Sequence, residues 1–331
     1  MRRKILVLVL ALGAALALAA VGYADDNAGF TPVEPRSPNA DRIFDSYLWI
    51  SIFALAILAL VEGALVTFII KYRRRGRPRT AEGPQIHGAT RLELIWTAIP
   101  VLILAAIAAF IFYKLPGIED VPSARAQGGP LEIRIDAHQF YWQFNYPGGG
   151  VSINDLHVPV NRVVRVRIHS QDVDHSWWVP ALGGKFDAIP GDPTETWFRA
   201  ERVGTYRGQC GEFCGVYHAA MRARVIAHSQ ADYAAWVQRE GPRTLGRSEW
   251  VNVCAQCHGL TGQGGYGPAI ANSSLLIQPE SLRALLRQGR NASGDIETYM
   301  PPVGRGWSER QFRALERYLQ AEIYKGAGSG S

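Results

Sequence analysis

Two long apolar segments constrain the fold of this chain more than any other feature. Tyr47 to Ile70 is 24 residues with one charge, Glu62, and Leu94 to Tyr113 is 20 residues with none. A helix needs about 20 consecutive apolar residues to cross the hydrocarbon core of a bilayer. We therefore predict two transmembrane helices, which form a hairpin within residues 25–120 of a multi-domain membrane protein.

The loop between the two segments sets the orientation of the hairpin. Short loops rich in Lys and Arg stay in the cytoplasm, so both ends of the hairpin lie on the opposite side. We expect a multi-pass protein of the bacterial inner (cytoplasmic) membrane, with its later domains on the periplasmic or outer face. Because basic residues concentrate in this loop, the net charge of +6 does not indicate a nucleic-acid partner. The loop contains Lys71, Arg73, Arg74, Arg75, Arg77, Arg79 and Arg91.

The N-terminus has the pattern of a secretory signal peptide. Arg2, Arg3 and Lys4 precede an apolar run, Ile5 to Val21, and small residues follow at Gly22-Tyr23-Ala24. A basic segment, an apolar segment and a small-residue cleavage site together predict a signal peptide of residues 1–24. A further transmembrane helix is the alternative, given the length of the apolar run.

The chain changes character after the hairpin. Leu131–Ala137, Val163–His169 and Arg222–Ala227 alternate apolar and polar residues, which is typical of half-buried strands. Gly and Pro separate these segments, and we expect no long amphipathic helix between residues 125 and 228. We predict an all-β domain of residues 121–235, built as a small antiparallel sandwich or barrel.

A group of soft metal-binding side chains lies near the end of this β region. Thiolates, imidazoles and a thioether favour copper, and apart from Met1 the chain has only two methionines. A mononuclear copper site of this kind uses one cysteine, whereas two thiolates can bridge two copper ions. A disulfide or a zinc site is the alternative. The predicted donors are His175, Cys210, the backbone carbonyl of Glu212, Cys214, His218 and Met221.

A second group, Cys254-Ala-Gln-Cys-His258, is a c-type haem attachment motif. Cys254 and Cys257 would form thioethers with the haem, while His258 and Met300 would ligate the iron. His/Met ligation raises the haem potential and is typical of an electron carrier. We expect the carbonyl of Pro268 to orient the His258 ring.

The segment around this motif predicts an all-α cytochrome c domain. We place the domain at residues 247–325, after a linker of residues 236–246 and before a tail of residues 326–331. Pro279 to Gln288 is amphipathic, and Ser308-Glu-Arg-Gln311 is a capping box that begins the last helix. The chain therefore holds two candidate redox sites in two neighbouring domains.

Residues 40–235 resemble subunit II of cytochrome c oxidase. The motifs that carry the resemblance are Cys210-Gly-Glu-Phe-Cys-Gly-Val-Tyr-His-Ala-Ala-Met221, Asp174-His-Ser-Trp, Lys185-Phe-Asp-Ala-Ile-Pro-Gly191, His138-Gln-Phe-Tyr-Trp-Gln-Phe144 and Glu93-Leu-Ile-Trp-Thr. The resemblance implies a cupredoxin-like domain with a dinuclear CuA centre, held by the six donors above. It also implies that the Glu212 side chain reaches a magnesium ion at the border with subunit I. By the same resemblance, Glu93 lies at the mouth of a proton channel into subunit I.

Residues 245–324 are similar to class I cytochrome c domains, so the whole chain resembles the fused subunit II of caa3-type oxidases. One position departs from the subunit II pattern. The family usually has a tryptophan where Phe140 stands, and that tryptophan accepts electrons from a docked cytochrome c. Phe140, Tyr141 and Trp142 are the candidate aromatic residues for this role here.

The predicted function is an electron relay within a proton-translocating cytochrome c oxidase of the respiratory chain. A donor such as cytochrome c reduces the haem c, the dicopper centre accepts the electron, and the haem of subunit I receives it, where oxygen is reduced to water with proton pumping. The chain is not catalytic for oxygen alone. Expected partners are subunit I, with haem a and copper B, subunit III and the lipid bilayer.

Two other classes of protein remain open from the residues. One is the CuA-bearing subunit of a nitric oxide or nitrous oxide reductase. The other is a copper-delivery protein, which would have an α/β fold and would lack His218, Met221 and the hairpin. The intact copper donors exclude a quinol-oxidase subunit, since that branch of the family has lost them.

Overall fold

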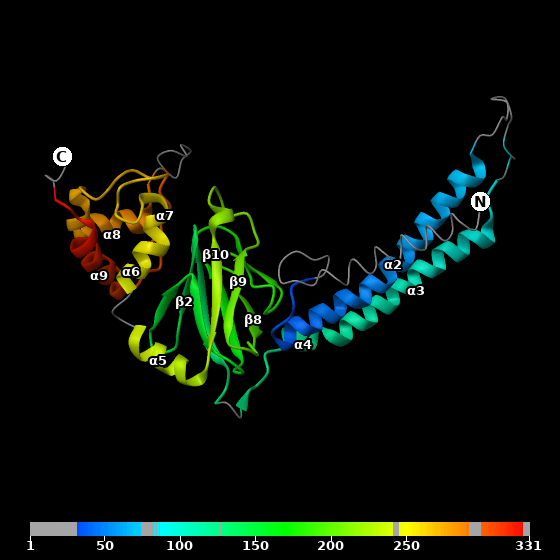
Figure 1. Ribbon diagram of the computed structural model, residues 1–331, viewed down its shortest axis with the longest axis horizontal. Helices are drawn as coiled ribbons and strands as arrows, with labels where there is room; N and C mark the ends of the chain where they lie inside the picture. Colours follow the sequence, from blue (N-terminus) through cyan, green and yellow to red (C-terminus); the bar gives the residue numbers. More distant parts are fainter. Residues whose placement is uncertain are drawn as a thin grey trace. The chain divides into compact units, whose positions relative to one another are not determined.

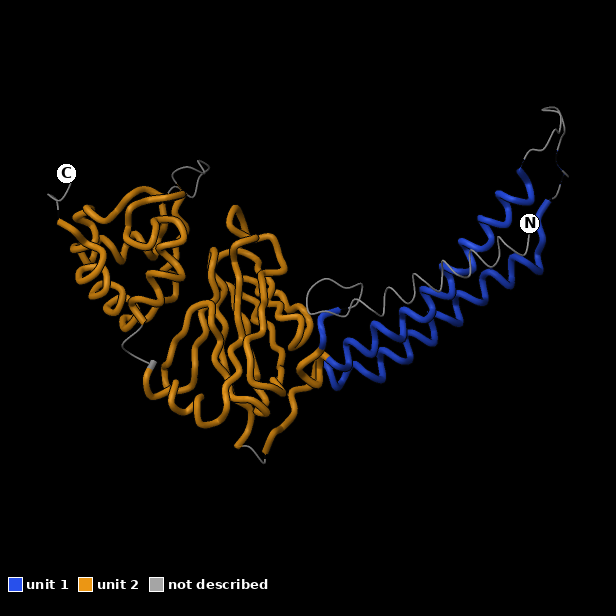
Figure 2. Tube along the Cα trace, in the orientation of Figure 1, with its two compact units in different colours: residues 1–34, 41–118 blue, residues 35–40, 119–331 orange. Residues whose placement is uncertain are grey.

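The computed structural model describes residues 32–73, 83, 85, 87–125, 128–240, 245–290 and 299–326. It divides into two compact units (Figure 2), of which unit 1 comprises residues 1–34 and 41–118 and unit 2 comprises residues 35–40 and 119–331. Several predicted features lie outside the described residues. They are the signal peptide of residues 1–24, residues 74–82, 84 and 86 of the basic loop, residues 241–244 of the linker and residues 327–331 of the tail.

Unit 1 contains the two long helices that the apolar segments predict. α2 (Pro38–Tyr72) and α3 (Thr90–Lys114) run side by side in Figure 1, and the short helix α4 (Pro116–Glu119) follows them. Lys114 Nζ lies 2.7 Å from Asp45 Oδ2, and the ring of Trp49 stacks on that of Phe110. These contacts join the beginning of α2 to the end of α3, so the pair is an antiparallel hairpin.

The surface of the hairpin is apolar, as a lipid-facing surface must be. Leu60 is 73% exposed and Leu102 is 68% exposed. Exposing so much apolar area to water is unfavourable, whereas lipid tails solvate it at no such cost. Within the described residues, α2 and the α3–α4 segment are the helices long and apolar enough to cross a membrane, which confirms the predicted pair.

Unit 2 begins with a sandwich of two five-stranded sheets among the described residues. The first sheet has the order β3-β2-β1-β5-β8, and its strands are β1 (Leu131–His138), β2 (Tyr141–Asn145), β3 (Val151–Ile153), β5 (Val164–Ser170) and β8 (Thr194–Phe198). The second has the order β4-β10-β9-β6-β7, with β4 (Asp155–Pro159), β6 (His175–Trp178), β7 (Lys185–Ala188), β9 (Gly204–Cys210) and β10 (Arg222–His228). The three predicted strand segments correspond to β1, β5 and β10.

The expectation of a purely antiparallel sandwich was wrong. β1 pairs with β5 in parallel, and β4 pairs with β10 in parallel, while the other pairs are antiparallel. The chain crosses to the second sheet at β4 and returns to the first at β5, so β5 comes back beside β1 in the same direction. Residues alternate between the two faces of a strand in either pairing. Periodicity therefore predicts strands but not their direction.

Strand β2 is buried on both faces, unlike the half-buried strands that alternation predicts. Trp142 and Phe144 point into the core between the sheets, and Tyr141 joins the core of the C-terminal domain. The sandwich core therefore covers one face of β2, and the C-terminal domain covers the other. The outward face of β2 is thus an internal contact surface of unit 2.

The rest of unit 2 is helical. After η2 (His218–Ala220), the described helices and helical turns are α5 (Gln230–Glu240), α6 (Leu245–Glu249), η3 (Trp250–Cys254), α7 (Ala255–His258), η4 (Ser274–Ile277), α8 (Pro279–Gln288), α9 (Glu309–Tyr318) and η6 (Leu319–Ile323). α8 has the predicted bounds, and α9 begins with the predicted capping box of Ser308 and Gln311. α5 extends through Glu240 and α6 begins at Leu245, so both overlap the segment that we predicted as a linker.

A glycine controls where α6 crosses α9. A Cβ added at Gly246 would lie 2.1 Å from the carbonyl oxygen of Ala314, which is a backbone atom that cannot move aside. The adjacent apolar residues Trp250, Leu315 and Phe312 then form the core of the helical domain. The absence of a side chain at residue 246 therefore permits the close approach on which this core depends.

We expect Gly246→Ala to destabilise the helical domain. Overpacking costs about 1–3 kcal/mol, whereas Ala gains about 1 kcal/mol over Gly within a helix, and the clash with a carbonyl oxygen makes the first effect the larger. Urea denaturation followed through the absorption of bound haem measures the change, with Arg247→Ala, on the exposed side of the same helix, as the control. A Gly246→Ala protein as stable as the wild type would contradict this account of the crossing.

Candidate functional site

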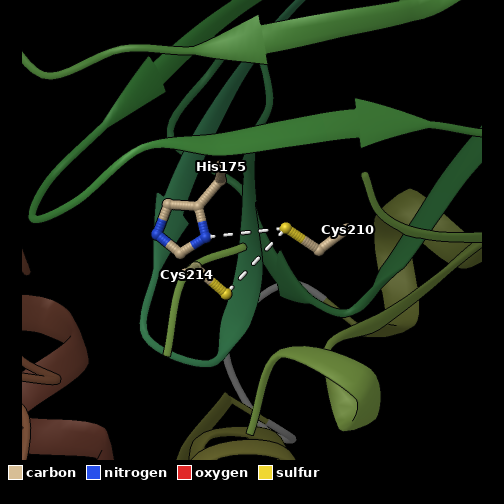
Figure 3. Close-up of side chains that lie close together, drawn as sticks. All are labelled: His175, Cys210 and Cys214. Carbon is tan, nitrogen blue, oxygen red and sulfur yellow. Dashed lines mark hydrogen bonds between the residues drawn. The ribbon is translucent and has the colours of Figure 1, made fainter. Parts of the chain in front are cut away.

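The predicted copper donors converge at one end of the second sheet. His175 begins β6 and Cys210 ends β9, and these two strands are neighbours in the sheet. The loop that follows Cys210 carries Cys214 and His218, and the backbone N–H of Cys210 donates to the carbonyl of Met221 at 3.0 Å. That hydrogen bond closes the loop where β10 begins. Figure 3 shows His175, Cys210 and Cys214 facing one another.

The two thiols lie at the centre of the donor group. Their sulfur atoms are 4.0 Å apart. A disulfide requires about 2.05 Å, so the cysteines are not a disulfide, and both thiols are free. Among the described residues, the cluster of metal-binding side chains is His175, Cys210 and Cys214, whose ligand atoms lie within 4.8 Å of one another.

The remaining donors are divided between the two thiols. Cys210 Sγ lies 3.8 Å from His175 Nδ1 and 3.2 Å from the Glu212 carbonyl oxygen. Cys214 Sγ lies 3.6 Å from His218 Nδ1 and 3.8 Å from Met221 Sδ. Each sulfur therefore has one imidazole and one weaker donor beside it. This set fits two soft ions that share the thiolates better than one tetrahedral zinc ion, which takes four ligands.

Burial and charge prepare the cluster for a cation. Cys210, Cys214, His175 and Met221 are all buried. The hydrogen bond with Cys214 lowers the pKa of Cys210 against the opposing effect of burial, and the hydrogen bond with His175 adds to the lowering. The hydrogen bond with Cys210, together with burial, raises the pKa of Cys214. The pair thus holds one thiolate readily, and a bound cation would stabilise the second.

Asp172 fixes the orientation of His175, and the sequence analysis missed it. Its Oδ1 lies 2.8 Å from His175 Nε2, so that Nδ1 is the nitrogen that faces Cys210. Burial opposes the charge of Asp172, but the hydrogen bonds from His175 and from the Gln139 amide outweigh it and lower the pKa of the carboxyl group. A carboxylate that holds the far nitrogen of a ligand histidine is a common support of metal sites. The aspartate three residues before His175 was the available signal.

The haem attachment motif lies where η3 joins α7. His258 Nδ1 lies 2.8 Å from the carbonyl oxygen of Pro268, which confirms the predicted contact and turns Nε2 away from it. A Cβ at Gly267 would lie 3.0 Å from His258 Cε1, so a larger residue would press on the ring. Cys254 and Cys257 are not joined in a disulfide, so both sulfur atoms are available for thioether bonds to a haem. The motif fits a haem whose iron is ligated through His258 Nε2.

Met300, the other predicted iron ligand, is held by its backbone. It exchanges two hydrogen bonds with Arg290, of 2.8 and 3.0 Å, and its side chain packs against the core of the helical domain. The backbone of Met300 is therefore fixed relative to the end of α8.

The aromatic run after β1 lies mostly beneath the surface. Trp142 is fully buried in the sandwich, with its ring 6.0 Å from the ring of His175. Tyr141 is fully buried against the helical domain, where its hydroxyl donates to the Val303 carbonyl. Phe140 is partly buried, and its ring lies 5.7 Å from that of Tyr217. Tyr141 and Trp142 consequently offer no surface to a soluble partner.

The two predicted acidic residues have local partners. The side chain of Glu93 accepts a hydrogen bond from the backbone N–H of Ala89 at 3.1 Å, which caps the beginning of α3. The side chain of Glu212 is exposed, and its Oε2 lies 3.7 Å from Lys185 Nζ. Both carboxylates remain open to solvent or to a neighbouring subunit.

Three family models match the chain. They are described as cytochrome c oxidase subunit II, transmembrane domain, over residues 33–113; cytochrome c oxidase subunit II, periplasmic domain, over residues 151–228; and cytochrome c oxidase, cbb3-type, subunit III, over residues 242–319. The third match covers the segment that holds the haem motif. The predicted architecture of hairpin, cupredoxin-like sandwich and cytochrome c domain is thereby confirmed.

Individual proteins give the same result. The chain is 34% identical over 320 residues to cytochrome c oxidase subunit 2 of Alkalihalophilus pseudofirmus, which covers 88% of this chain and 90% of that one. It is 34% identical to cytochrome c oxidase subunit 2 of Thermostichus vulcanus, over 61% of this chain and 75% of the other. A crystal structure of the periplasmic domain of subunit II of the Bradyrhizobium japonicum cytochrome oxidase is 36% identical, covers 36% of this chain and 94% of that chain, and has a TM-score of 0.33. Because the match to the Alkalihalophilus protein extends along most of both chains, this chain belongs to the cytochrome c oxidase subunit 2 family of the haem-copper oxidase complex, and it also carries a cytochrome c domain.

Proposed function

We propose that the chain relays electrons one at a time from a donor, through a covalent haem c and a dinuclear CuA centre, to the haem of subunit I, where oxygen is reduced to water with proton pumping. The observation that carries the proposal is the convergence of two thiols, two imidazoles, a thioether and a carbonyl in one cluster, in which both thiols and the thioether are buried. Because a cytochrome c domain follows the subunit II domains in one chain, we propose that the oxidase is of the caa3 type.

The copper pair would be held by His175, Cys210, the Glu212 carbonyl, Cys214, His218 and Met221. A thiolate-bridged pair, when bound, supplies a one-electron carrier that needs little rearrangement. The protein contributes rigidity, because His175 and Cys210 stand on paired strands and Asp172 holds the His175 ring. It also excludes water, because both thiols and Met221 are buried.

The haem would be attached to Cys254 and Cys257, with His258 and Met300 as iron ligands. Such a haem supplies a second one-electron carrier, whose potential is raised by the methionine ligand. The Pro268 carbonyl holds the His258 ring in one tautomer and orientation. The backbone pairing of Met300 with Arg290 fixes the backbone position of Met300.

The fused domain changes where a donor would deliver electrons. Tyr141 and Trp142 are fully buried, so we propose that cytochrome c or another donor meets the helical domain rather than the aromatic run. Because the haem domain is covalently linked, its effective concentration at the copper domain is high without a docking step. Phe140 then need not serve a soluble partner.

The division of the chain and its surroundings complete the proposal. Residues 1–24 are a signal peptide, residues 25–120 hold the hairpin beside subunit I, and residues 121–235 and 247–325 are the copper and haem domains on the periplasmic side of the bacterial inner membrane. Subunit III is a further partner. We propose that the Glu212 side chain binds magnesium at the subunit I border and that Glu93 lies at the mouth of a proton channel. The exposure of both carboxylates supports these roles.

The alternatives receive less support. A copper-delivery protein would have an α/β fold, whereas unit 2 begins with a β-sandwich. A nitric oxide or nitrous oxide reductase subunit could use the same copper donors, but the relative that matches over 88% of this chain is named as a cytochrome c oxidase subunit. Co-purification with a subunit that contains haem a, together with oxygen-dependent oxidation of added cytochrome c, tests the oxidase assignment. A partner that reduces nitrogen oxides would overturn it.

We expect Cys214→Ser to abolish the delocalised mixed-valence EPR signal of the copper pair, because a hydroxyl is a poor substitute for a bridging thiolate. The covalent haem content should not change. EPR of the purified oxidase and haem staining of a denaturing gel measure the two sites separately. A wild-type protein without the mixed-valence signal, or a variant that retains it, would contradict the dinuclear assignment.

We expect the double variant Cys254→Ser/Cys257→Ser to lose covalent haem and to retain the mixed-valence copper signal. Chemical reductants should still reduce its copper, while reduction by the physiological donor should fail. Haem staining and EPR on the same preparation report the result. Normal reduction of copper by the donor in this variant would show that electrons do not pass through the haem domain.

We expect Asp172→Asn to weaken copper binding by about 10–100-fold, the usual cost of losing a carboxylate that supports a ligand histidine. Asp174→Asn is the matched control. Asp174 is exposed, and its substitution removes the same charge at a position two residues away from Asp172. Copper retained after dialysis against graded chelator gives the affinity. Equal copper loss in the two variants would indicate an effect of charge alone and contradict the role of Asp172.

A further inference from the structure

The outward face of β2 and the turn before it bind the helical domain. Tyr141 and Gln143 are alternate residues of β2 and so lie on the same face of the strand, while Gln139 lies in the turn that precedes the strand. Each is hydrogen-bonded to a different part of the C-terminal domain. The pairs are Tyr299 hydroxyl with Gln139 Oε1 at 2.7 Å, Tyr141 hydroxyl with the Val303 carbonyl at 2.5 Å, and Gln311 Nε2 with Gln143 Oε1 at 2.8 Å.

Gln139 differs from the other two because it also contacts the copper loop. Its Nε2 donates to the Cys214 carbonyl at 2.6 Å, and its backbone N–H donates to Asp172 Oδ2 at 2.7 Å. Cys214 is a predicted copper ligand, and Asp172 supports His175. On the other side, Tyr299 directly precedes Met300 in the chain. One buried side chain therefore links the loops of the two sites.

The chemistry of this link requires an amide. The Cys214 carbonyl can only accept a hydrogen bond, so the amide nitrogen must face it, and the amide oxygen must then face the Tyr299 hydroxyl. A carboxylate would lack the donor, and an aliphatic side chain would lack both groups. Gly215 provides the room, since a Cβ there would lie 3.0 Å from Gln139 Nε2 and the residue has φ of 130°.

A second contact joins the copper loop to the segment that follows the haem attachment motif. Tyr217 is next to His218 in the copper loop, and its ring meets that of Tyr266 edge to face, with centroids 4.8 Å apart. The helical domain thus also contacts the copper loop directly, beside the predicted ligand His218.

We propose that Gln139 is a positioning residue, which bridges the Met300 loop to the copper loop and holds the two redox sites in the arrangement used for electron transfer between them. The proposal rests on the proposed function, because it assumes that haem and copper occupy their sites. The step that it serves moves one electron, which leaves the haem iron and is taken up by the copper pair. No bond to Gln139 is formed or broken.

Gln139→Leu and Tyr299→Phe test the bridge in the purified oxidase. We expect each to slow electron transfer from haem to copper several-fold after photochemical reduction of the haem. We also expect hydrogen exchange of the backbone amides of Tyr299, Met300 and Val303 to become about fivefold faster, which corresponds to the net value of one hydrogen bond. Gln139→Glu should slow transfer as well, because it keeps the acceptor for Tyr299 but loses the donor to Cys214.

Gln143→Leu is the matched control. Gln143 lies in β2, four residues after Gln139. It binds the same domain through Gln311, and its other side-chain hydrogen bond goes to Asn145 and not to either site. We expect its transfer rate to equal that of the wild type. The mixed-valence copper signal and the absorption of Met-ligated haem must be present in every variant compared, so that a change of rate reports the bridge and not a lost cofactor.

Three outcomes would overturn the proposal. They are wild-type rates in Gln139→Leu and Tyr299→Phe, an equal loss of rate in Gln143→Leu, and additive effects in the Gln139→Leu/Tyr299→Phe double variant, since residues joined by one bridge should not act independently. Failure of the proposed function would look different. In that case the wild-type protein itself would transfer no electron from haem to copper.

Discussion

The backbone hydrogen bond between Cys210 and Met221 is the constraint on which the copper site depends. It joins the end of β9 to the residue before β10, so a loop of ten residues must return to its starting point. Cys214 and His218 lie on that loop, and His175 stands on the neighbouring strand β6. Sheet pairing thereby brings together donors that are distant in sequence. Because these donors are already in place, little conformational entropy is lost when a metal binds. Asp172 completes the arrangement by fixing the remaining freedom of the His175 ring.

The outward face of β2 has a similar importance for the haem domain. Tyr141 and Ile153 belong to the apolar cluster that also contains Trp250, Leu282 and Phe312. Polar contacts surround this shared core, among them those of Gln139 and Gln143. Burial of apolar area supplies the stabilisation, while the hydrogen bonds fix one orientation, since a buried polar group without a partner is costly. Tyr141 combines both effects, because its ring lies in the apolar cluster and its hydroxyl accepts a hydrogen bond of 2.8 Å from the Trp307 indole N–H.

Much of the fold could be predicted from local sequence patterns, because the forces involved act over a few residues. The alternation in β1, the amphipathic α8 and the capping box of Ser308 and Gln311 are all of this kind. The contact of His258 with Pro268 also spans only ten residues. Parallel pairing of β1 with β5 could not be predicted, since alternation is blind to strand direction. The link from Gln139 to Tyr299 crosses 160 residues and depends on how two domains meet, for which one sequence contains no local signal.

The shared core has a consequence for how the molecule must be assembled. A cupredoxin domain without its C-terminal neighbour would expose Tyr141 and Ile153 to water and would remove the partners of the Gln139 and Gln143 amide oxygens in that neighbour. The haem domain is therefore a structural component of the sandwich, and the two should unfold as one cooperative body. An organism that lost the cytochrome segment by truncation of the gene would not recover an ordinary two-domain subunit. It would first have to replace the outward face of β2 with residues that tolerate solvent.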